Sequence, residues 1–246
     1  MTRLSVVIPA KNEAENIVAL VEGIDRALSG HEPFEIIVVD DCSTDNSVAV
    51  LQARAATMPH LRIVRHDRSG GQSAAVHSGV KAATAPVICT LDGDGQNPPE
   101  ELPKLVAPIL NDTTGRIGLV AGQRVGRQDT WSKKWASKFA NGLRGWILQD
   151  GTRDTGCGLK AFQRQAFLDL PYFDHMHRYL PALFNRDGWQ VAHVDVSHRP
   201  RGAGRSNYSN IQRALVGVVD LFGVAWLLRR RKKARIVPDI ASRDAK

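Results

Sequence analysis

The first half of the chain alternates short apolar runs with longer amphipathic stretches. Continuous apolar runs rich in β-branched residues are typical of strands covered on both faces, as in a parallel sheet. Four such runs predict strands over residues 4–9, 34–40, 61–66 and 86–91. The stretches between them carry apolar residues at helical spacing and predict helices over residues 16–28, 45–56 and 73–83. This alternation predicts right-handed βαβ units.

The pattern of the second half is less regular. Two prolines followed by two acids predict a helix that starts near residue 98. Further helices are expected over residues 131–148, 163–170 and 210–230, further strands over 118–122 and 190–197, and glycine-containing loops over 151–158 and 199–209. The predicted fold class is α/β: a Rossmann-like, mainly parallel sheet flanked by helices, in one domain over residues 1–210, with a C-terminal amphipathic helix.

Acidic residues follow three of the predicted strands. They are Glu13 after the first strand, Asp40 and Asp41 at the end of the second, and Asp92 and Asp94 after the fourth. Ligands of open α/β sheets bind beyond the carboxyl ends of the strands, so we expect these acids to converge on one site. Residues two apart in an extended chain face the same side, which allows Asp92 and Asp94 to act together.

The Asp92-Gly93-Asp94 segment has two interpretations. An Asp-x-Asp pair often occurs by chance, and it would then be a solvated turn. Because it follows a buried strand, we favour a site for Mg²⁺ or Mn²⁺, with a third oxygen from Gln96. Gly93 would let the backbone bend closely around a ligand.

The residues after the first two strands also suit helix capping. Asn12 is expected to cap the first helix, and Ser43, Thr44 or Asp45 the second. A cap needs only one side chain, so the neighbouring Asp41 is predicted to accept hydrogen bonds from a nucleoside. The glycines at 70 and 71 lack the phosphate-loop pattern and are interpreted as tight helix packing.

The charge is unevenly distributed along the chain. The formal net charge is +8, but residues 1–115 carry −6, residues 116–228 carry +8 and residues 229–246 carry +6. A nucleic-acid-binding protein would spread positive charge over its binding fold, and no recognised nucleic-acid motif is present. Nucleic acid is therefore not an expected partner, and non-enzymatic nucleic-acid binding is a remote alternative.

Cysteine and histidine spacing argues against a structural zinc site. Cys42, Cys89 and Cys157 are far apart and odd in number, so neither a disulfide framework nor a Cys-x-x-Cys pair is expected. Cys89, and Cys42 with it, is interpreted as a buried small hydrophobic residue. His175 and His177 are two apart on a predicted helix and would face different sides.

Three ordered segments resemble the family-2 glycosyltransferases of the GT-A fold. The segments are VIPAKNE at residues 7–13, VVDDCSTD at 38–45 and LDGDGQNPPE at 91–100. They look most like the polyprenyl-phosphate branch of dolichol-phosphate mannosyltransferase-like enzymes, over roughly residues 4–210. The resemblance implies a nucleotide-sugar half over about 1–115 and an acceptor half over about 116–210.

The resemblance also implies roles for individual residues. The GDP- or UDP-linked donor would contact Pro9, Glu13, Asp41, Asp92, Gly93, Arg201 and Ser206. The cation would lie on Asp92, Asp94 and Gln96, and the acceptor phosphate on Arg124, Lys133 and Ser137. Asp94, Arg124 and Arg201 would carry the catalysis. Lys11 stands where relatives often have Tyr, and Asn207 where Lys is usual, which leaves the choice of nucleotide open.

Two features of the acceptor half have alternative interpretations. Residues 116–144 carry seven basic side chains against Asp129 alone, which fits a solvated helix face or an acidic substrate. The segment from Asp154 to Gly158 resembles a family segment that shapes the sugar pocket, or it is a glycine loop without a ligand.

The last predicted helix combines an apolar face with a basic end. Its apolar residues are followed by five consecutive basic residues at 229–233. Packing on the core explains the apolar face alone, whereas an anionic membrane surface explains both features. The apolar stretch of about 15 residues contains Asp220 and is shorter than the roughly 20 residues of a membrane span. We therefore expect a peripheral amphipathic helix over 211–233, a flexible tail over 234–246, no signal peptide and a location at the cytoplasmic face of the membrane.

These expectations combine into one predicted reaction. It is the metal-dependent, inverting transfer of a sugar from a nucleotide sugar to a polyprenyl monophosphate. A phosphate acceptor is largely ionised near neutrality, its second pKa being about 6, and needs no general base. The alternative is a sugar or protein hydroxyl acceptor, which would need a base such as Asp154 or Asp92.

Overall fold

The structure is a computed structural model, and it describes all residues except 1, 126–143, 146, 200–209, 231–233 and 235–246. The first half contains β1 (Leu4–Ala10), α1 (Ile17–Leu28), β2 (Phe34–Asp40), α2 (Ser47–Ala55), β3 (Leu61–Arg65), α3 (Gly71–Ala82) and β4 (Val87–Thr90). It continues with a 3₁₀ helix η1 (Pro99–Glu101), α4 (Leu102–Leu110) and β5 (Ile117–Arg124). The remaining elements are β6 (Lys160–Gln163), α6 (Arg164–Leu168), a second 3₁₀ helix η2 (Met176–Arg178), α7 (Leu180–Arg186), β7 (Gln190–Val196) and α8 (Asn210–Arg229).

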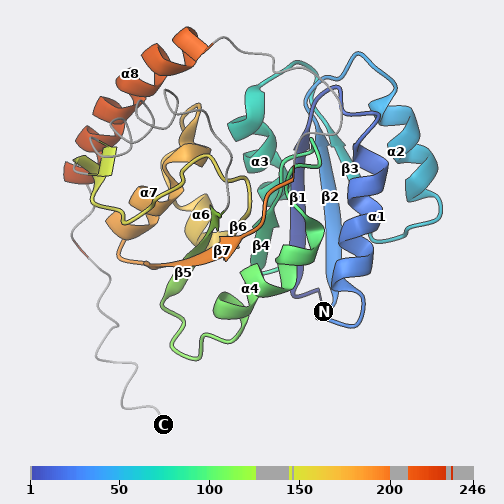
Figure 1. Ribbon diagram of the computed structural model, residues 1–246, viewed down its shortest axis with the longest axis horizontal. Helices are drawn as coiled ribbons and strands as arrows, with labels where there is room; N and C mark the ends of the chain where they lie inside the picture. Colours follow the sequence, from blue (N-terminus) through green and yellow to red (C-terminus); the bar gives the residue numbers. More distant parts are fainter. Residues whose placement is uncertain (1, 126–143, 146, 200–209, 231–233, 235–246) are drawn as a thin grey trace, which may run out of the picture.

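The strands form one seven-stranded sheet in the order β3-β2-β1-β4-β6-β5-β7 (Figure 1). β6 runs antiparallel to both of its neighbours, while the other neighbouring pairs are parallel. This confirms the predicted mainly parallel α/β sheet. β6 and α7 were not predicted, because a four-residue strand and a seven-residue helix carry too little periodicity to detect.

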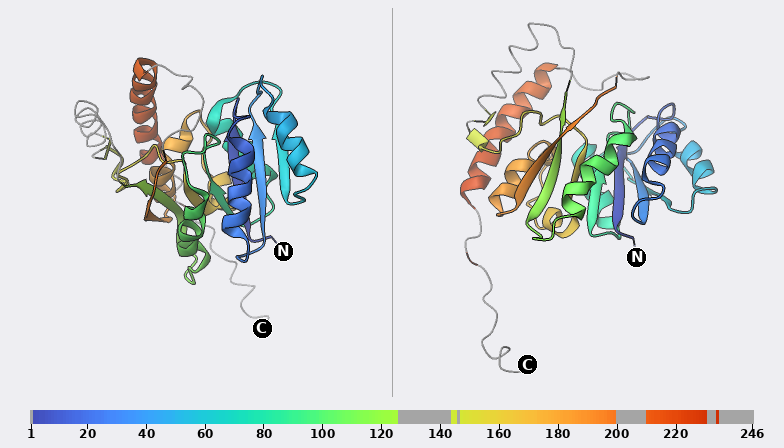
Figure 2. Two further views of the ribbon diagram at one scale, coloured as in Figure 1. Left: turned by 45° about the vertical axis from the view of Figure 1, so that its right-hand side comes forward. Right: turned by 60° about the horizontal axis from the view of Figure 1, so that its bottom comes forward.

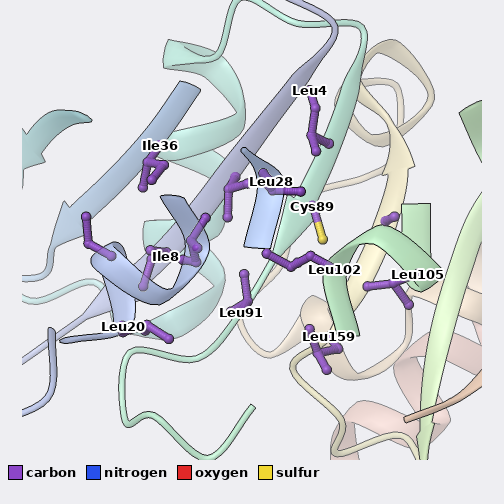
Figure 3. Packing of buried hydrophobic residues seen from close by; sticks show 14 of the residues in the cluster. Leu4, Ile8, Leu20, Leu28, Ile36, Cys89, Leu91, Leu102, Leu105 and Leu159 are labelled. Carbon is purple, nitrogen blue, oxygen red and sulfur yellow. The ribbon is translucent and has the colours of Figure 1, made fainter. Parts of the chain in front are cut away.

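Helices cover both faces of the sheet because successive strand residues point to opposite sides. Val6 and Ile8 of β1 belong to a core shared with α1 and α4, which Figure 3 shows from close by. Val7 belongs to the opposite core, which includes residues of α3, α6 and α7. Both cores are built from buried hydrophobic side chains, aliphatic around α1 and α4 and both aliphatic and aromatic on the opposite face, so the sheet is a rigid support for the loops at its ends.

Close contact between α3 and the sheet depends on one glycine. A Cβ added at Gly79 would lie 2.4 Å from Cγ1 of Val7 and 3.0 Å from Cγ2 of Val39. Gly79 therefore serves packing, whereas Gly70 and Gly71, for which the sequence predicted tight packing, donate their backbone N–H groups to Asp41. Of the cysteines, Cys89 is fully buried as expected, whereas Cys42 is only half-buried and adopts a positive φ of 61°.

α8 lies at the end of the molecule opposite α1 and α2 (Figure 2). Val224, Leu221 and Leu228 pack against the core that contains α7. Arg186 of α7 holds the last turn of α8, because its Nε donates to the carbonyl of Leu227 at 2.9 Å. One face of α8 therefore packs on the domain.

Candidate active site

A cavity of about 1030 Å³ opens at the carboxyl edge of β1, β2 and β4. It brings together every predicted site residue that the structure describes, namely Pro9, Glu13, Asp41, Asp92, Gly93, Asp94, Gln96 and Arg124. The predicted convergence is therefore confirmed for Glu13, Asp41, Asp92 and Asp94, whereas Asp40 is buried and is not among the residues that line the cavity. Lys133, Ser137, Arg201 and Ser206 lie outside the described residues.

The loops after β1 and β2 bind each other rather than capping their helices. The backbone N–H of Asn12 donates to Oγ of Ser43 at 2.9 Å, and Oδ1 of Asn12 accepts from the N–H of Thr44 at 2.8 Å. Within the described residues, the N-cap positions of α1 and α2 form no side-chain cap bond, so the predicted capping by Asn12 and Ser43 is wrong. Asp45 does bind the N–H of Ser47 at the start of α2, at 3.0 Å. The hydrogen bonds of Asn12 with Ser43 and Thr44 fix one wall of the cavity.

Asp41 is the centre of a hydrogen-bond network. Its Oδ1 accepts from the N–H of Gly70 and from Nδ1 of His66, both at 2.7 Å. Its Oδ2 accepts from Oγ of Ser69 at 2.7 Å and from the N–H of Gly71 at 2.9 Å. Burial alone would raise the pKa of Asp41, but these hydrogen bonds, led by Gly70, outweigh burial and lower it.

The network around Asp41 changes the expected role of this residue. A carboxylate offers about four acceptor positions, and four donors of the chain already use them. Asp41 thereby holds the glycine loop against the end of β2, and Ser69 in turn accepts from Nζ of Lys11 at 2.8 Å. A direct bond from Asp41 to a nucleoside stays a prediction, and it would require one of these donors to be exchanged.

Asp92 and Asp94 both line the cavity. Asp94 is buried and its Oδ1 accepts from the N–H of Gln96 at 3.1 Å, while Asp92 is partly buried and accepts from Nε2 of Gln72 at 2.7 Å. Burial, and after it the charge of Asp94, raises the pKa of Asp92, although Lys160 and Arg124 oppose that effect. A Cβ added at Gly158 would lie 2.3 Å from Oδ2 of Asp92, so the opposite wall closes directly onto this carboxylate.

These oxygens fit a divalent cation. The charge of Asp94 contributes to the raised pKa of Asp92, and a bound cation would relieve that repulsion. Among the described residues, no group of three or more His, Cys, Asp or Glu side chains is arranged to hold a metal. The third oxygen would therefore come from an amide, and Gln96 lines the same cavity.

Arg124 is committed to a partner within the chain. Its Nε and Nη2 donate to the two oxygens of Asp154 at 2.5 and 2.8 Å. This bidentate pair lowers the pKa of Asp154 against the effect of burial, so Asp154 is a weak base. The glycine-rich segment that begins at Asp154 lines the cavity, which favours the pocket interpretation of that segment.

Three further residues of the acceptor half line the cavity: Lys160, His177 and Arg178. Sequence reasoning placed Lys160 at the end of the segment that begins at Asp154 and considered His177 as a metal ligand, and it did not single out Arg178. Lys160 is buried on β6 and donates to the carbonyl of Cys157. Nδ1 of His177 lies 2.8 Å from Oγ of Ser73 on α3. The unpredicted strand β6 positions Lys160, and η2 positions His177 and Arg178. No local sequence motif predicted these positions.

Comparison with known proteins places the chain in a family. Residues 5–170 match the family model described as glycosyl transferase family 2. The chain belongs to this family. Two curated relatives are undecaprenyl-phosphate 4-deoxy-4-formamido-L-arabinose transferases, from Sodalis glossinidius (strain morsitans) and Serratia proteamaculans (strain 568). Each is 35% identical over 84% of this chain, which spans 63% of the relative's length, somewhat less than two thirds.

Solved structures of this glycosyltransferase's fold include glucosyl-3-phosphoglycerate synthase from Mycobacterium tuberculosis. Its UDP complex has a TM-score of 0.69 and 21% identity, and the match covers 92% of this chain and 80% of that one. Another structure of it holds Mn²⁺, UDP and glucosyl-3-phosphoglycerate, with a TM-score of 0.69 and 19% identity over 94% of this chain and 82% of that one. At these identities the likeness shows the fold, and it confirms the GT-A-like architecture.

The outer face of α8 is apolar and exposed. Val218, Val219, Phe222 and Trp226 are the large hydrophobic side chains that it presents. The guanidinium of Arg230 lies 6.0 Å from the centroid of the Trp226 ring. Across the described residues, the structure contains no helix that combines the length and the apolarity of a membrane span.

Proposed function

We propose that this glycosyltransferase moves a sugar from a nucleotide sugar to a polyprenyl monophosphate. The observation that carries the proposal is a single cavity lined by the paired acids Asp92 and Asp94 and by the cations Arg124, Lys160 and Arg178. The two curated relatives are named as transferases to undecaprenyl phosphate, which supports this acceptor class. The transferred sugar is left open by these observations.

The two parts of the donor would bind to different loops of the cavity. The nucleoside would lie on the loops after β1 and β2, beside Pro9, Glu13 and the Asp41 network, and the diphosphate beside Asp92, Gly93 and Asp94. When bound by Asp92, Asp94 and Gln96, Mg²⁺ or Mn²⁺ offsets the charge that grows on the departing diphosphate. Arg201 and Ser206 are proposed to assist from the loop that the resemblance places over the donor.

The acceptor is proposed to be a phosphate rather than a hydroxyl. A hydroxyl needs a base in the cavity, and Asp154 is unsuited to that role because Arg124 stabilises its charged form. A phosphate is already ionised near neutrality. Cations that orient it toward the anomeric carbon then lower the entropic cost of the encounter, and Arg124, Lys133 and Ser137 are the sequence-predicted contacts.

Product extraction tests the acceptor class. The protein is incubated with Mn²⁺, undecaprenyl phosphate and a panel of radiolabelled UDP- and GDP-sugars, and the products are partitioned between water and organic solvent. Label in the organic phase is expected for at least one donor and absent when undecaprenol replaces the phosphate. Equal transfer to the alcohol, or label on water-soluble acceptors only, would contradict the proposal.

We further propose that α8 attaches the enzyme to the cytoplasmic face of an anionic membrane. Its exposed apolar side chains would enter the interface while the adjoining basic residues contact lipid headgroups, at about 1 kcal/mol per cation. Vesicles of phosphatidylglycerol should bind the protein more tightly than vesicles of phosphatidylcholine. Substitution of Phe222 and Trp226 by serine should weaken this binding, whereas Tyr172→Ser, at an exposed aromatic residue outside α8, should not.

A further inference from the structure

Two arginines line the cavity, and they differ in their partners. Arg124 donates from two nitrogens to Asp154. Arg178, the last residue of η2, is half-buried, and within the part of the chain that the structure describes its guanidinium forms no hydrogen bond or ion pair. Removing a cation from water is unfavourable unless an anion compensates, so Arg178 is the cavity arginine that lacks its counterion.

The backbone around Arg178 is firmly held. Met176 and Tyr179 on either side are buried, and Ser73 accepts from the N–H of His177 at 3.4 Å. The hydroxyl of Tyr179 donates to the carbonyl of Gly217 in α8 at 3.2 Å. Arg178 is therefore presented from a fixed segment that connects the cavity to α8.

The surroundings of Arg178 favour an anionic ligand. Lys160 and His177 line the same side of the cavity. Asp220 of α8 is the carboxylate influenced by the charge of Arg178, and the two are farther apart than an ion pair. A guanidinium offers a planar fork of donors that matches two oxygens of a phosphate.

We propose that Arg178 binds the phosphate monoester of the acceptor. This inference rests on the proposed function for the identity of the reaction, but the binding itself can be measured without transfer. The segment contacts α8 through Tyr179 and Gly217, and α8 presents exposed apolar side chains on its outer face, so a lipid phosphate fits this position. A small soluble phosphomonoester has the same chemistry, and the experiment must separate the two sources.

Binding of phosphate probes to three variants tests the proposal. Affinities for geranyl phosphate and for 3-phosphoglycerate are measured by calorimetry on Arg178→Gln, Arg178→Lys and Arg116→Gln. Arg116 is exposed just before the amino end of β5 and controls for the loss of one positive charge. The affinity for UDP and GDP in the presence of Mn²⁺ shows whether a variant affects the donor site, and thermal unfolding shows whether the variant is folded.

Arg178→Gln is expected to weaken geranyl phosphate binding by about 10- to 100-fold, the effect of losing hydrogen bonds to a charged group. Arg178→Lys should recover part of this loss, because the charge remains without the fork. The nucleotide affinity of the Arg178 variants should stay within about twofold of that of the wild type. The phosphate affinity of Arg116→Gln should likewise stay within about twofold. The probe that binds more tightly, and loses more in Arg178→Gln, identifies a lipid or a soluble source.

Three results would overturn the inference. They are a wild type that binds neither phosphate probe, a geranyl phosphate affinity that Arg178→Gln leaves unchanged, and a loss of nucleotide affinity as large as the loss of phosphate affinity. The last result would place Arg178 on the donor diphosphate. If Arg178→Gln does not fold, Arg178→Lys decides, since unchanged affinity would then show that the fork is not used. Failure of transfer together with Arg178-dependent phosphate binding would reject the proposed function and leave this inference standing.

Discussion

Glu35 and Asp92 are acids at opposite ends of the same sheet, and their pKa values shift in opposite directions. Glu35, near the amino end of β2, accepts from Oγ of Ser5, from the N–H and Oγ1 of Thr84, and from Nη1 of Arg62, all within 2.7 Å. Burial would raise the pKa of Glu35, but these four bonds lower it to about 2. Asp92, beyond the carboxyl end of β4, is partly buried beside a second acid, and its pKa is raised.

We propose that the difference separates a structural acid from a functional one. At the amino end the chain supplies every donor that the carboxylate needs, so the charge of Glu35 stabilises the fold. At the carboxyl end the chain places two carboxylates together, and their repulsion is unfavourable until a ligand arrives. Acids in such an arrangement mark functional sites, because binding provides the compensation that folding lacks.

Replacement of the central acids should produce the largest effect. Asp94→Asn and Asp92→Asn should each lower kcat/KM by more than about 100-fold, since a direct ligand should cost at least as much as the outer-shell partners of metal sites. The raised pKa means that charged Asp92 opposes folding above about pH 4, so Asp92→Asn should leave the free energy of unfolding at pH 7 unchanged or higher. Urea unfolding and transfer rates are the measurements. Retained Mn²⁺-dependent transfer in Asp94→Asn would contradict the metal assignment.

Replacement of Glu35 should give the opposite result. Glu35→Gln should lower the free energy of unfolding by about 3 kcal/mol at pH 7 without changing the KM for donor or acceptor. Because the folded-state pKa is depressed to about 2 from 4.5, the contribution is complete above about pH 4.5 and is lost as the pH falls toward 2. Urea unfolding between pH 7 and 2 should therefore show the wild type and variant converging. A constant gap would show that the carboxylate charge is not responsible.

Substitutions at two glycines compare the core with the cavity without changing the charge of the protein. Gly79→Ala would place a Cβ 2.4 Å from Val7 and should lower the free energy of unfolding by about 1–3 kcal/mol with unchanged KM values. Gly158→Ala would place one 2.3 Å from the Asp92 carboxylate and should reduce transfer by about 10- to 100-fold with a smaller loss of stability. Calorimetric melting and steady-state kinetics on the pair provide the check. The same phenotype from both variants would remove the distinction between core and cavity.

The smallest effect is expected at Arg62. Its side chain is 45% exposed, and three other donors remain on Glu35, so Arg62→Gln should lower the free energy of unfolding by less than about 1 kcal/mol. Urea unfolding at low and high salt measures this contribution. A loss as large as that of Glu35→Gln would mean that a single ion pair, rather than the hydrogen-bond cluster, stabilises the acid.

The sequence alone determined the first half of the fold and the acidic centre of the site. Buried strands with apolar runs, and helices with period 3.6, are local patterns, and parallel strands must end at the same edge of the sheet. The convergence of Glu13, Asp92 and Asp94 follows from those rules, and the cavity contains all three. The family segments are likewise contiguous in sequence, so the family could be identified before the fold was known.

Tertiary structure decided the pairing of the remaining polar residues. Arg124 meets Asp154 across 30 positions, and Ser73 meets His177 across 104. Arg124 is paired, whereas Arg178 faces the cavity. This difference depends on how β6, η2 and α8 pack, and their contacts produce no periodic pattern in the local sequence. The sequence gives the chemical type of each side chain. Its hydrogen-bond and ion-pair partners are the groups that lie near it in space, and only the folded chain determines which groups those are.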